Sequence, residues 1–181
     1  YSTAHTFFFD QETGAPLGAK THQGYADDSL WARGQGWAIH GFATAAQWTG
    51  SSDYRDIALN AAERFMAELP SDYVPTWDLR LPDDAPHYLD TSASAIAAAG
   101  MLRLARQVDP PASTQLREHA STLLRALIDH HLETQPDAQG LLRNGTYHAH
   151  KGYGVNEYFI CGDYFFLDAL LTIENHCPDL W

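Results

Sequence analysis

The chain carries the sequence THQGYADDSLWARGQGW at residues 21–37, and this stretch decides how the remaining residues are interpreted. It concentrates tryptophan, arginine, histidine and three glycines around the start of one predicted helix. Glycine inside a helix costs roughly 1 kcal/mol relative to alanine. A helix that only filled a core would not be expected to combine these residue types, so the stretch predicts a binding function.

The predicted helix spans residues 30–48 and follows the sequence Asp-Asp-Ser at residues 27–29. These residue types cap helices by accepting hydrogen bonds from the free N–H groups of the first turn. Arg33 and Trp37 are four residues apart and therefore share a face of the helix. Trp31 lies in the first turn, where its ring can lean over the helix N-terminus.

The residues before this helix add neutral hydrogen-bonding groups to the same end. His22, Gln23 and Tyr25 precede the expected cap. Together with the helix N-terminus and the arginine, they would suit a sugar ring that carries a carboxylate. The glycines at positions 34 and 36 predict close approach by another backbone or by a ligand.

This stretch closely resembles the unsaturated glucuronyl hydrolases, glycoside hydrolase family 88, whose chains carry THQGYxDDSxWARGQxW. Two further segments, DTSASA at residues 90–95 and GDYFFLDALL at residues 162–171, resemble the same family in the same order. The resemblance implies an all-α fold, an (α/α)6 barrel of six inner and six outer helices. Residues 1–181 would form the C-terminal part of this single catalytic domain, about half of the barrel.

The helical pattern of the chain is compatible with such a barrel. Amphipathic helices are expected at residues 53–69 and 113–133, and helices rich in small or apolar residues at residues 90–107 and 162–175. With the helix at residues 30–48, this gives three inner and two outer helices. A helical solenoid would produce a similar alternation.

The resemblance implies an enzyme that releases a 4,5-unsaturated uronic acid from the non-reducing end of a lyase product. An aspartate protonates the double bond at C4 while water is activated for C5, and the resulting hemiketal opens. That aspartate lies in the family's N-terminal half, so no catalytic residue is expected in this chain. Asp27, Asp28 and Asp90 are interpreted as helix caps.

The predicted substrate-binding residues come from the first helix, its approach and a long loop at residues 135–158. His5 is placed in the unsaturated-sugar pocket by alignment with the family, although a loop histidine without a partner is an equal alternative. The set is His5, His22, Gln23, Trp31, Arg33, Trp37, His148, Lys151 and Tyr153.

No cofactor or metal is expected. His148 and His150 form a His-x-His pair, but no carboxylate or cysteine is spaced to complete a zinc site. Asp83 and Asp84 are interpreted as a solvated turn rather than a catalytic pair. Cys161 and Cys177 are too few for a disulfide framework and are expected to be free thiols.

The chain is acidic, with 23 Asp and Glu against 11 Lys and Arg and a formal charge of −12. This charge disfavours nucleic acid and anionic membranes as partners. Because the implied substrate is also an anion, the site must be locally positive, through Arg33, His22, Lys151 and helix N-termini. No signal peptide or membrane span is present in these residues, which leaves the bacterial cytoplasm and periplasm open.

Three functions remain open: the hydrolase, a non-catalytic module that binds acidic carbohydrate, and a relative acting on unsaturated rhamnogalacturonan fragments. The intact motif favours the first. A half barrel would expose apolar faces of its inner helices. The chain is therefore expected to be stable only with the missing N-terminal half of the enzyme or with a second copy of itself.

Overall fold

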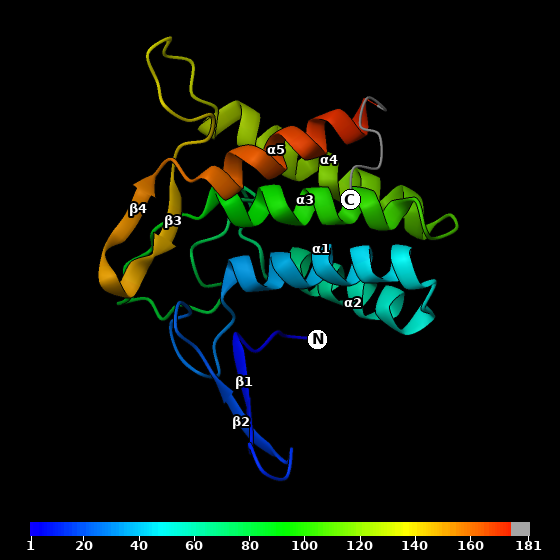
Figure 1. Ribbon diagram of the computed structural model, residues 1–181. Coiled ribbons are helices and arrows are strands. Elements are labelled where there is room, and N and C mark those ends of the chain that lie inside the picture. The colour runs from blue at the N-terminus through cyan, green and yellow to red at the C-terminus, as the bar shows by residue number, and fades with distance from the viewer. Residues whose placement is uncertain (175–181) are drawn as a thin grey trace.

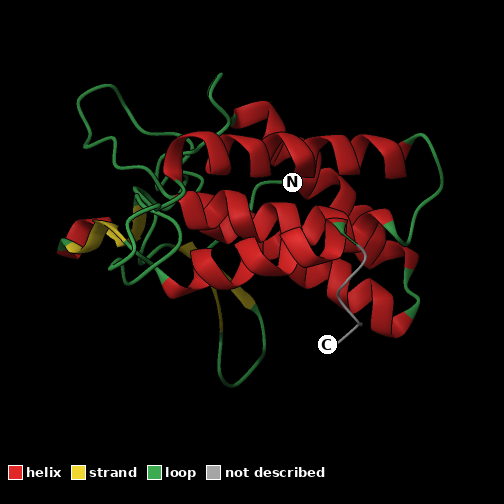
Figure 2. Cartoon of the chain, turned by 90° about the horizontal axis from the view of Figure 1, so that it is seen from above, coloured by secondary structure: helices red, strands yellow, loops and turns green. Residues whose placement is uncertain are grey.

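The computed structural model describes residues 1–174, which are mostly helical (Figures 1 and 2). The described helices are α1 (Ala32–Thr49), α2 (Ser52–Glu68), α3 (Thr91–Ala105), α4 (Ala112–His131) and α5 (Ile160–Ile173). Two antiparallel hairpins accompany them, β1 (Thr6–Phe9) with β2 (Pro16–Lys20), and β3 (Gly145–His148) with β4 (Tyr153–Glu157). A short 3-10 helix, η1 (Ala149–Lys151), links the second pair. No helix among residues 1–174 is long and apolar enough to cross a membrane.

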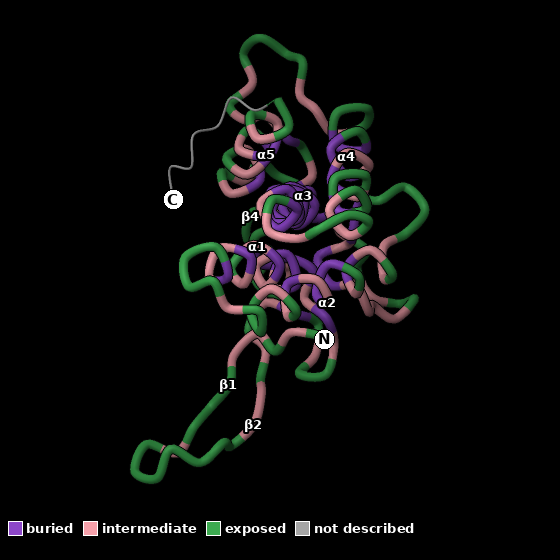
Figure 3. Tube along the Cα trace, turned by 90° about the vertical axis from the view of Figure 1, so that its right-hand side faces the viewer, coloured by how far each residue is buried: buried purple, intermediate pink, exposed green. Residues whose placement is uncertain are grey.

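Helix α3 is the centre of the structure. It lies between α1 and α2 on one side and α4 and α5 on the other (Figures 1 and 3). Ten of its 15 residues are alanine, serine or leucine, and every residue from Thr91 to Ala105 except Arg103 is buried. Small side chains allow neighbouring helices to approach on several sides at once. The prediction of a closely packed small-residue helix is confirmed.

Two glycines set the close approach of α1 and α3. A Cβ added to Gly100 would lie 2.7 Å from the backbone nitrogen of His40 and 2.8 Å from its Cα. A Cβ added to Gly36 would lie 3.1 Å from the carbonyl oxygen of Ala93. The expectation that a glycine in the first turns of α1 meets another backbone therefore holds for Gly36.

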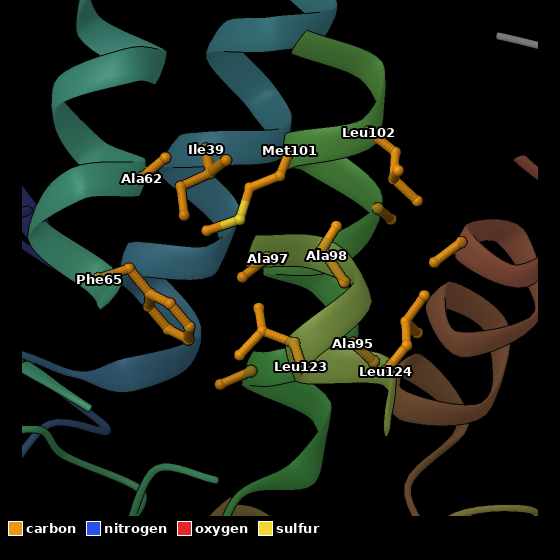
Figure 4. Packing of buried hydrophobic residues seen from close by; sticks show 14 of the residues in the cluster. Ile39, Ala62, Phe65, Ala95, Ala97, Ala98, Met101, Leu102, Leu123 and Leu124 are labelled. Atoms are coloured by element: carbon orange, nitrogen blue, oxygen red, sulfur yellow. The ribbon is translucent and has the colours of Figure 1, made fainter. Parts of the chain in front are cut away.

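The outer layer is formed by amphipathic helices that bury one face each. Helix α2 contributes Phe65, which is fully buried, and α4 contributes Leu123 and Leu127 (Figure 4 shows Phe65 and Leu123). Each such side chain stabilises the fold by about 1.5–3 kcal/mol relative to an exposed position. They belong to the same buried cluster as Ile39 of α1 and Met101 of α3.

The predicted N-cap of α1 is wrong. The helix begins at Ala32, Trp31 occupies the N-cap position, and no side chain caps the helix. Asp27 instead accepts the Thr21 N–H at 2.8 Å, and the Ser29 hydroxyl donates to Asp78 at 2.6 Å. These side chains precede the helix and form hydrogen bonds with other parts of the chain, so they do not cap it.

The long loop predicted at residues 135–158 contains the β3–β4 hairpin. Asn144 and Asn156, at the two ends of the paired region, have positive φ angles of 62° and 55°, and the register shifts between Gly145 and Thr146. The turn uses two more positive φ angles, at Gly152 and Gly154. This glycine and asparagine content hid the alternation that would have predicted strands. The predicted approach at residues 1–26 likewise contains the β1–β2 hairpin.

Candidate functional site

The candidate site lies at the N-terminal ends of α1 and α3, where the loop at residues 21–31 meets the β3–β4 hairpin. Asp78 organises this loop although its side chain is fully buried. Its carboxylate accepts the N–H groups of Tyr25 at 2.9 Å and Leu30 at 3.1 Å. It also accepts hydrogen bonds from the Ser29 hydroxyl and the Arg80 N–H, so both carboxylate oxygens are hydrogen-bonded within the protein. Sequence reasoning missed Asp78, because nothing in its local pattern separates it from a solvated loop aspartate.

His5 and Trp31 form an aromatic wall on this site. Their rings stack with centroids 4.2 Å apart and planes 25° apart. The Nδ1 atom of His5 accepts the backbone N–H groups of His22 and Gln23, each at 3.2 Å. This leaves the proton of the neutral ring on Nε2. His5 is therefore not an isolated loop histidine.

Burial and nearby basic side chains both favour the neutral form of His5. Its pKa is lowered by burial first, and then by repulsion from His22, Arg33 and His148. The His22 ring stands edge-on to it with centroids 5.7 Å apart. The wall thus offers an aromatic face and a neutral N–H donor rather than a cation or a general base.

Arg33 is buried beside this wall and is 2% exposed. Its Nη1 atom donates to Asp90 at 2.5 Å and to the Thr146 carbonyl at 2.7 Å, and Nη2 donates to the Tyr147 carbonyl at 2.7 Å. The guanidinium carbon lies 4.8 Å from the Trp31 ring centre. Three of its five N–H groups are thus engaged inside the protein, which leaves less of the fork for a ligand than the sequence suggests.

Asp90 is a buried partner of Arg33, so the interpretation of Asp90 as a helix cap is wrong. It occupies the N-cap position of α3 but makes no side-chain cap bond. Burial raises the pKa of this carboxyl, against the lowering effects of Arg33, the Ser92 hydroxyl and the Thr146 N–H. The motif at residues 90–95 singled out Asp90. However, the sequence of an aspartate before a helix is the same whether the side chain caps the helix or forms an ion pair.

The hairpin is hydrogen-bonded to the loop at residues 21–31 by two further contacts. Gln23 donates from Nε2 to the Tyr147 carbonyl at 2.8 Å, and the His150 Nε2 lies 2.8 Å from the Gly24 carbonyl. His148 is 9% exposed, and its Nδ1 has no hydrogen-bond partner among the described residues. Its pKa is lowered by burial and by the neighbouring Lys151, His150 and Arg33. Because this nitrogen is enclosed by the protein, His148 helps to form the side of the site rather than an open hydrogen-bonding position.

The structure brings together six of the nine predicted residues: His5, His22, Gln23, Trp31, Arg33 and His148. Trp37 lies one to two turns further along α1, edge-on to Phe165 of α5 with centroids 5.1 Å apart. Lys151 and Tyr153 lie around the exposed turn of the hairpin. They border the cluster rather than forming its wall.

The chemistry available here is recognition. Both buried carboxylates, Asp78 and Asp90, accept hydrogen bonds from internal donors, and burial lowers the pKa of His5. Among residues 1–174, no three His, Cys, Asp or Glu side chains approach closely enough to hold a metal ion. Cys161 is a free thiol, and Cys177 lies outside the described residues.

Comparisons with known proteins agree with this sequence pattern. A model described as Glycosyl Hydrolase Family 88 matches residues 1–173. The chain is 40% identical over 183 residues to the unsaturated glucuronyl hydrolase of Bacillus sp. (strain GL1), covering 99% of this chain and 48% of that protein. It is also 40% identical over 186 residues to the unsaturated chondroitin disaccharide hydrolase of Streptococcus pneumoniae (strain ATCC BAA-255 / R6), covering 99% of this chain and 46% of that protein.

A solved structure gives the same relationship. The unsaturated glucuronyl hydrolase from Bacillus sp. GL1, described as responsible for the degradation of glycosaminoglycan, superposes with a TM-score of 0.92 at 41% identity. The match covers 96% of this chain and 47% of that one. The chain therefore spans about half the length of the relatives it matches.

Proposed function

The chain belongs to glycosyl hydrolase family 88, and on this basis we propose that it is part of an unsaturated glucuronyl hydrolase. The enzyme would act on oligosaccharides left by polysaccharide lyases and release the unsaturated uronic acid from their non-reducing end. One observation carries the proposal: the stacked His5–Trp31 wall lies beside the buried guanidinium of Arg33, within the stretch that carries the family motif.

We assign the residues of the site separate roles. Trp31 would present its ring to the sugar, and the Nε2–H of His5 would donate to a sugar oxygen or to the uronate. His148 would line the pocket beside the same sugar. The exposed Lys151 and Tyr153 would contact the next sugar along the oligosaccharide, and Trp37 would line the pocket further along α1.

Arg33 would mainly hold the site together rather than bind the substrate carboxylate directly. Its charge is matched by Asp90, and its donors hold two hairpin carbonyls. The remaining N–H groups of its guanidinium, next to the Trp31 ring, would face the uronate. His22 and Gln23 would complete the polar edge of the pocket.

The reaction needs a proton donor, and the two buried carboxylates of the site are poorly suited to supply it. Hydration adds a proton to C4 and the hydroxyl of water to C5 of the ring, and the hemiketal formed at C5 then opens with loss of the aglycone. Asp90 and Asp78 are buried and already accept three or more hydrogen bonds each. We therefore place the general acid and base in the part of the enzyme outside this chain.

We propose that residues 1–181 form about half of a single (α/α)6 barrel, with α1, α3 and α5 as inner helices and α2 and α4 as outer helices. Helix α3 is buried nearly throughout, whereas α5 presents an exposed apolar stripe at helical spacing. The stripe consists of Ile160, Tyr164, Leu167 and Leu171.

A second free surface lies on the opposite edge. An apolar groove of about 300 Å3 runs between the N-terminal residues and α1 and α2, lined by Ala38, Phe42 and Ile57 among others. Both surfaces flank the row of inner helices. They are where the missing half of the barrel, or a second copy of the chain, would pack.

The alternative of a binding module is favoured by one observation for the isolated chain, namely that both buried carboxylates are internally paired. The two functions separate in one experiment. The ultraviolet absorbance of an unsaturated disaccharide is followed with residues 1–181 alone and with the chain joined to the N-terminal half of the enzyme. Loss of absorbance only in the joined sample supports the hydrolase. Turnover by residues 1–181 alone would refute the placement of the acid, and binding without turnover in both samples would favour the module.

A further inference from the structure

A buried ion pair joins three segments that are far apart in the sequence. Asp90, at the start of α3, accepts hydrogen bonds from Arg33 of α1 and from the Ser92 hydroxyl, each at 2.5 Å. The Thr146 N–H of β3 approaches the same carboxylate at 3.4 Å. The side chains of the pair are 3% and 0% exposed.

Arg33 also links the ion pair to the β3–β4 hairpin. Its Nη1 and Nη2 atoms hold the carbonyls of Thr146 and Tyr147, the two residues directly before His148. Trp31 and Phe159 flank the guanidinium, with ring centres 4.8 Å and 5.0 Å from its central carbon. The planar fork is thus held by hydrogen bonds at its edge and contacted by two aromatic rings.

We propose that Asp90 is a positioning residue for substrate binding, which orients Arg33 and thereby holds β3 and His148 against the Trp31 wall. The hairpin consists of two short strands, and such a pair is at best marginally stable by itself. The hairpin is anchored to the rest of the chain through Arg33, Asp90 and single hydrogen bonds, including those of Gln23 to the Tyr147 carbonyl and of the Thr146 hydroxyl to the Leu89 carbonyl. The kinetic test of this role rests on the proposed function, whereas the hydrogen-exchange test does not.

Hydrogen exchange tests the role without any substrate. In Asp90→Asn the neutral amide no longer holds the guanidinium by charge, so amides of residues 145–157 should exchange roughly tenfold faster or more. Residues 91–105 should keep their protection, because the apolar packing of α3 is unchanged. The exposed Asp129→Asn on α4 is the matched control and should leave both segments as in the wild type.

A second variant breaks the same link from the other end. Arg33→Lys keeps a positive charge beside Asp90 but replaces the planar fork by one ammonium, which does not match the three acceptors. It should also release residues 145–157 selectively. An unchanged hairpin, equal loss of protection in α3, or failure of both variants to fold would overturn the positioning role and make the pair a general core element.

Kinetics on an unsaturated disaccharide then test its consequence. In the complete enzyme, Asp90→Asn should raise KM on the order of tenfold while kcat changes less, since the hairpin binds rather than reacts. The double variant with Arg33→Lys should be no worse than Arg33→Lys alone, because both act through one link. Additive losses would overturn the proposal. If even the wild type turns over no unsaturated uronide, the proposed function fails, and hydrogen exchange still decides the role of Asp90.

Discussion

Replacement of Gly100 by alanine tests the close packing that sets the inner helices side by side. The new methyl carbon would lie 2.7 Å from the His40 backbone nitrogen and 2.8 Å from its Cα. Carbon atoms pack best at about 3.5–4.0 Å, so α1 and α3 would have to separate by several tenths of an ångström or more. The obstruction is backbone rather than a mobile side chain, so no rotamer change relieves it.

The magnitude follows from two opposing effects. Overpacking costs about 1–3 kcal/mol, and a backbone obstruction places this site at the upper end or beyond it. Alanine recovers about 1 kcal/mol of helix propensity. We therefore expect Gly100→Ala to lower the free energy of unfolding by about 2 kcal/mol.

Gly41→Ala is the matched control, because it makes the same substitution next to His40 in the interior of α1. A Cβ at Gly41 would meet nothing within 4 Å. Only helix propensity remains, so this variant should gain about 0.5–1 kcal/mol. Urea unfolding of the two purified variants, followed by far-ultraviolet circular dichroism, measures the difference of about 3 kcal/mol. Equal stabilities, or a stabilised Gly100→Ala, would refute the packing argument.

Three further predictions concern pH, binding and assembly. Burial, with repulsion from Arg103, lowers the pKa of His40 to about 4 from its ordinary 6.5. The contribution of neutral His40 to the free energy of unfolding is therefore fully present above pH 6.5, and up to about 3 kcal/mol is lost as the pH drops through 4. His40→Gln should flatten this pH dependence, as measured by urea unfolding at a series of pH values. Trp31→Ala removes the stacking face of His5 and should weaken binding of an unsaturated disaccharide on the order of tenfold or more in calorimetry, whereas Trp48→Ala, at an exposed position of α1, should leave it unchanged. Residues 1–181 alone should self-associate in sedimentation experiments because of the apolar stripe on α5, and a monomer with a single cooperative melting transition would contradict this.

Helix positions could be predicted from the sequence because apolar periodicity and alanine content act locally. The helix expected at residues 53–69 was found at Ser52–Glu68, and the one expected at residues 113–133 at Ala112–His131. The start of α1 could not be predicted in the same way. Its apparent cap residues are used in tertiary contacts, with Asp78 accepting hydrogen bonds from a segment about fifty residues away.

The candidate site was predictable where residue type alone indicates recognition. Trp31 and Gln23 of the motif lie together with His5, which the family resemblance had placed in the same pocket. Asp90 was assigned the wrong role, because the sequence contains no information that Arg33 lies opposite it. The β3–β4 hairpin was missed because glycine and asparagine at its turns and bulge interrupt the alternation of a strand.

The proposed binding of an anionic sugar by a chain of charge −12 needs a source of positive potential. Arg33 supplies little of it, since Asp90 neutralises its charge, and the lowered pKa values of His5 and His148 leave these rings neutral. The backbone offers another source. Helices α1, α3 and α5 begin at Ala32, Thr91 and Ile160, and each start adjoins a residue of one cluster: Trp31, Asp90 or Phe159, all in contact with Arg33. Each helix N-terminus carries roughly half a positive charge, so three of them meeting around one arginine would draw in a carboxylate without any exposed cation.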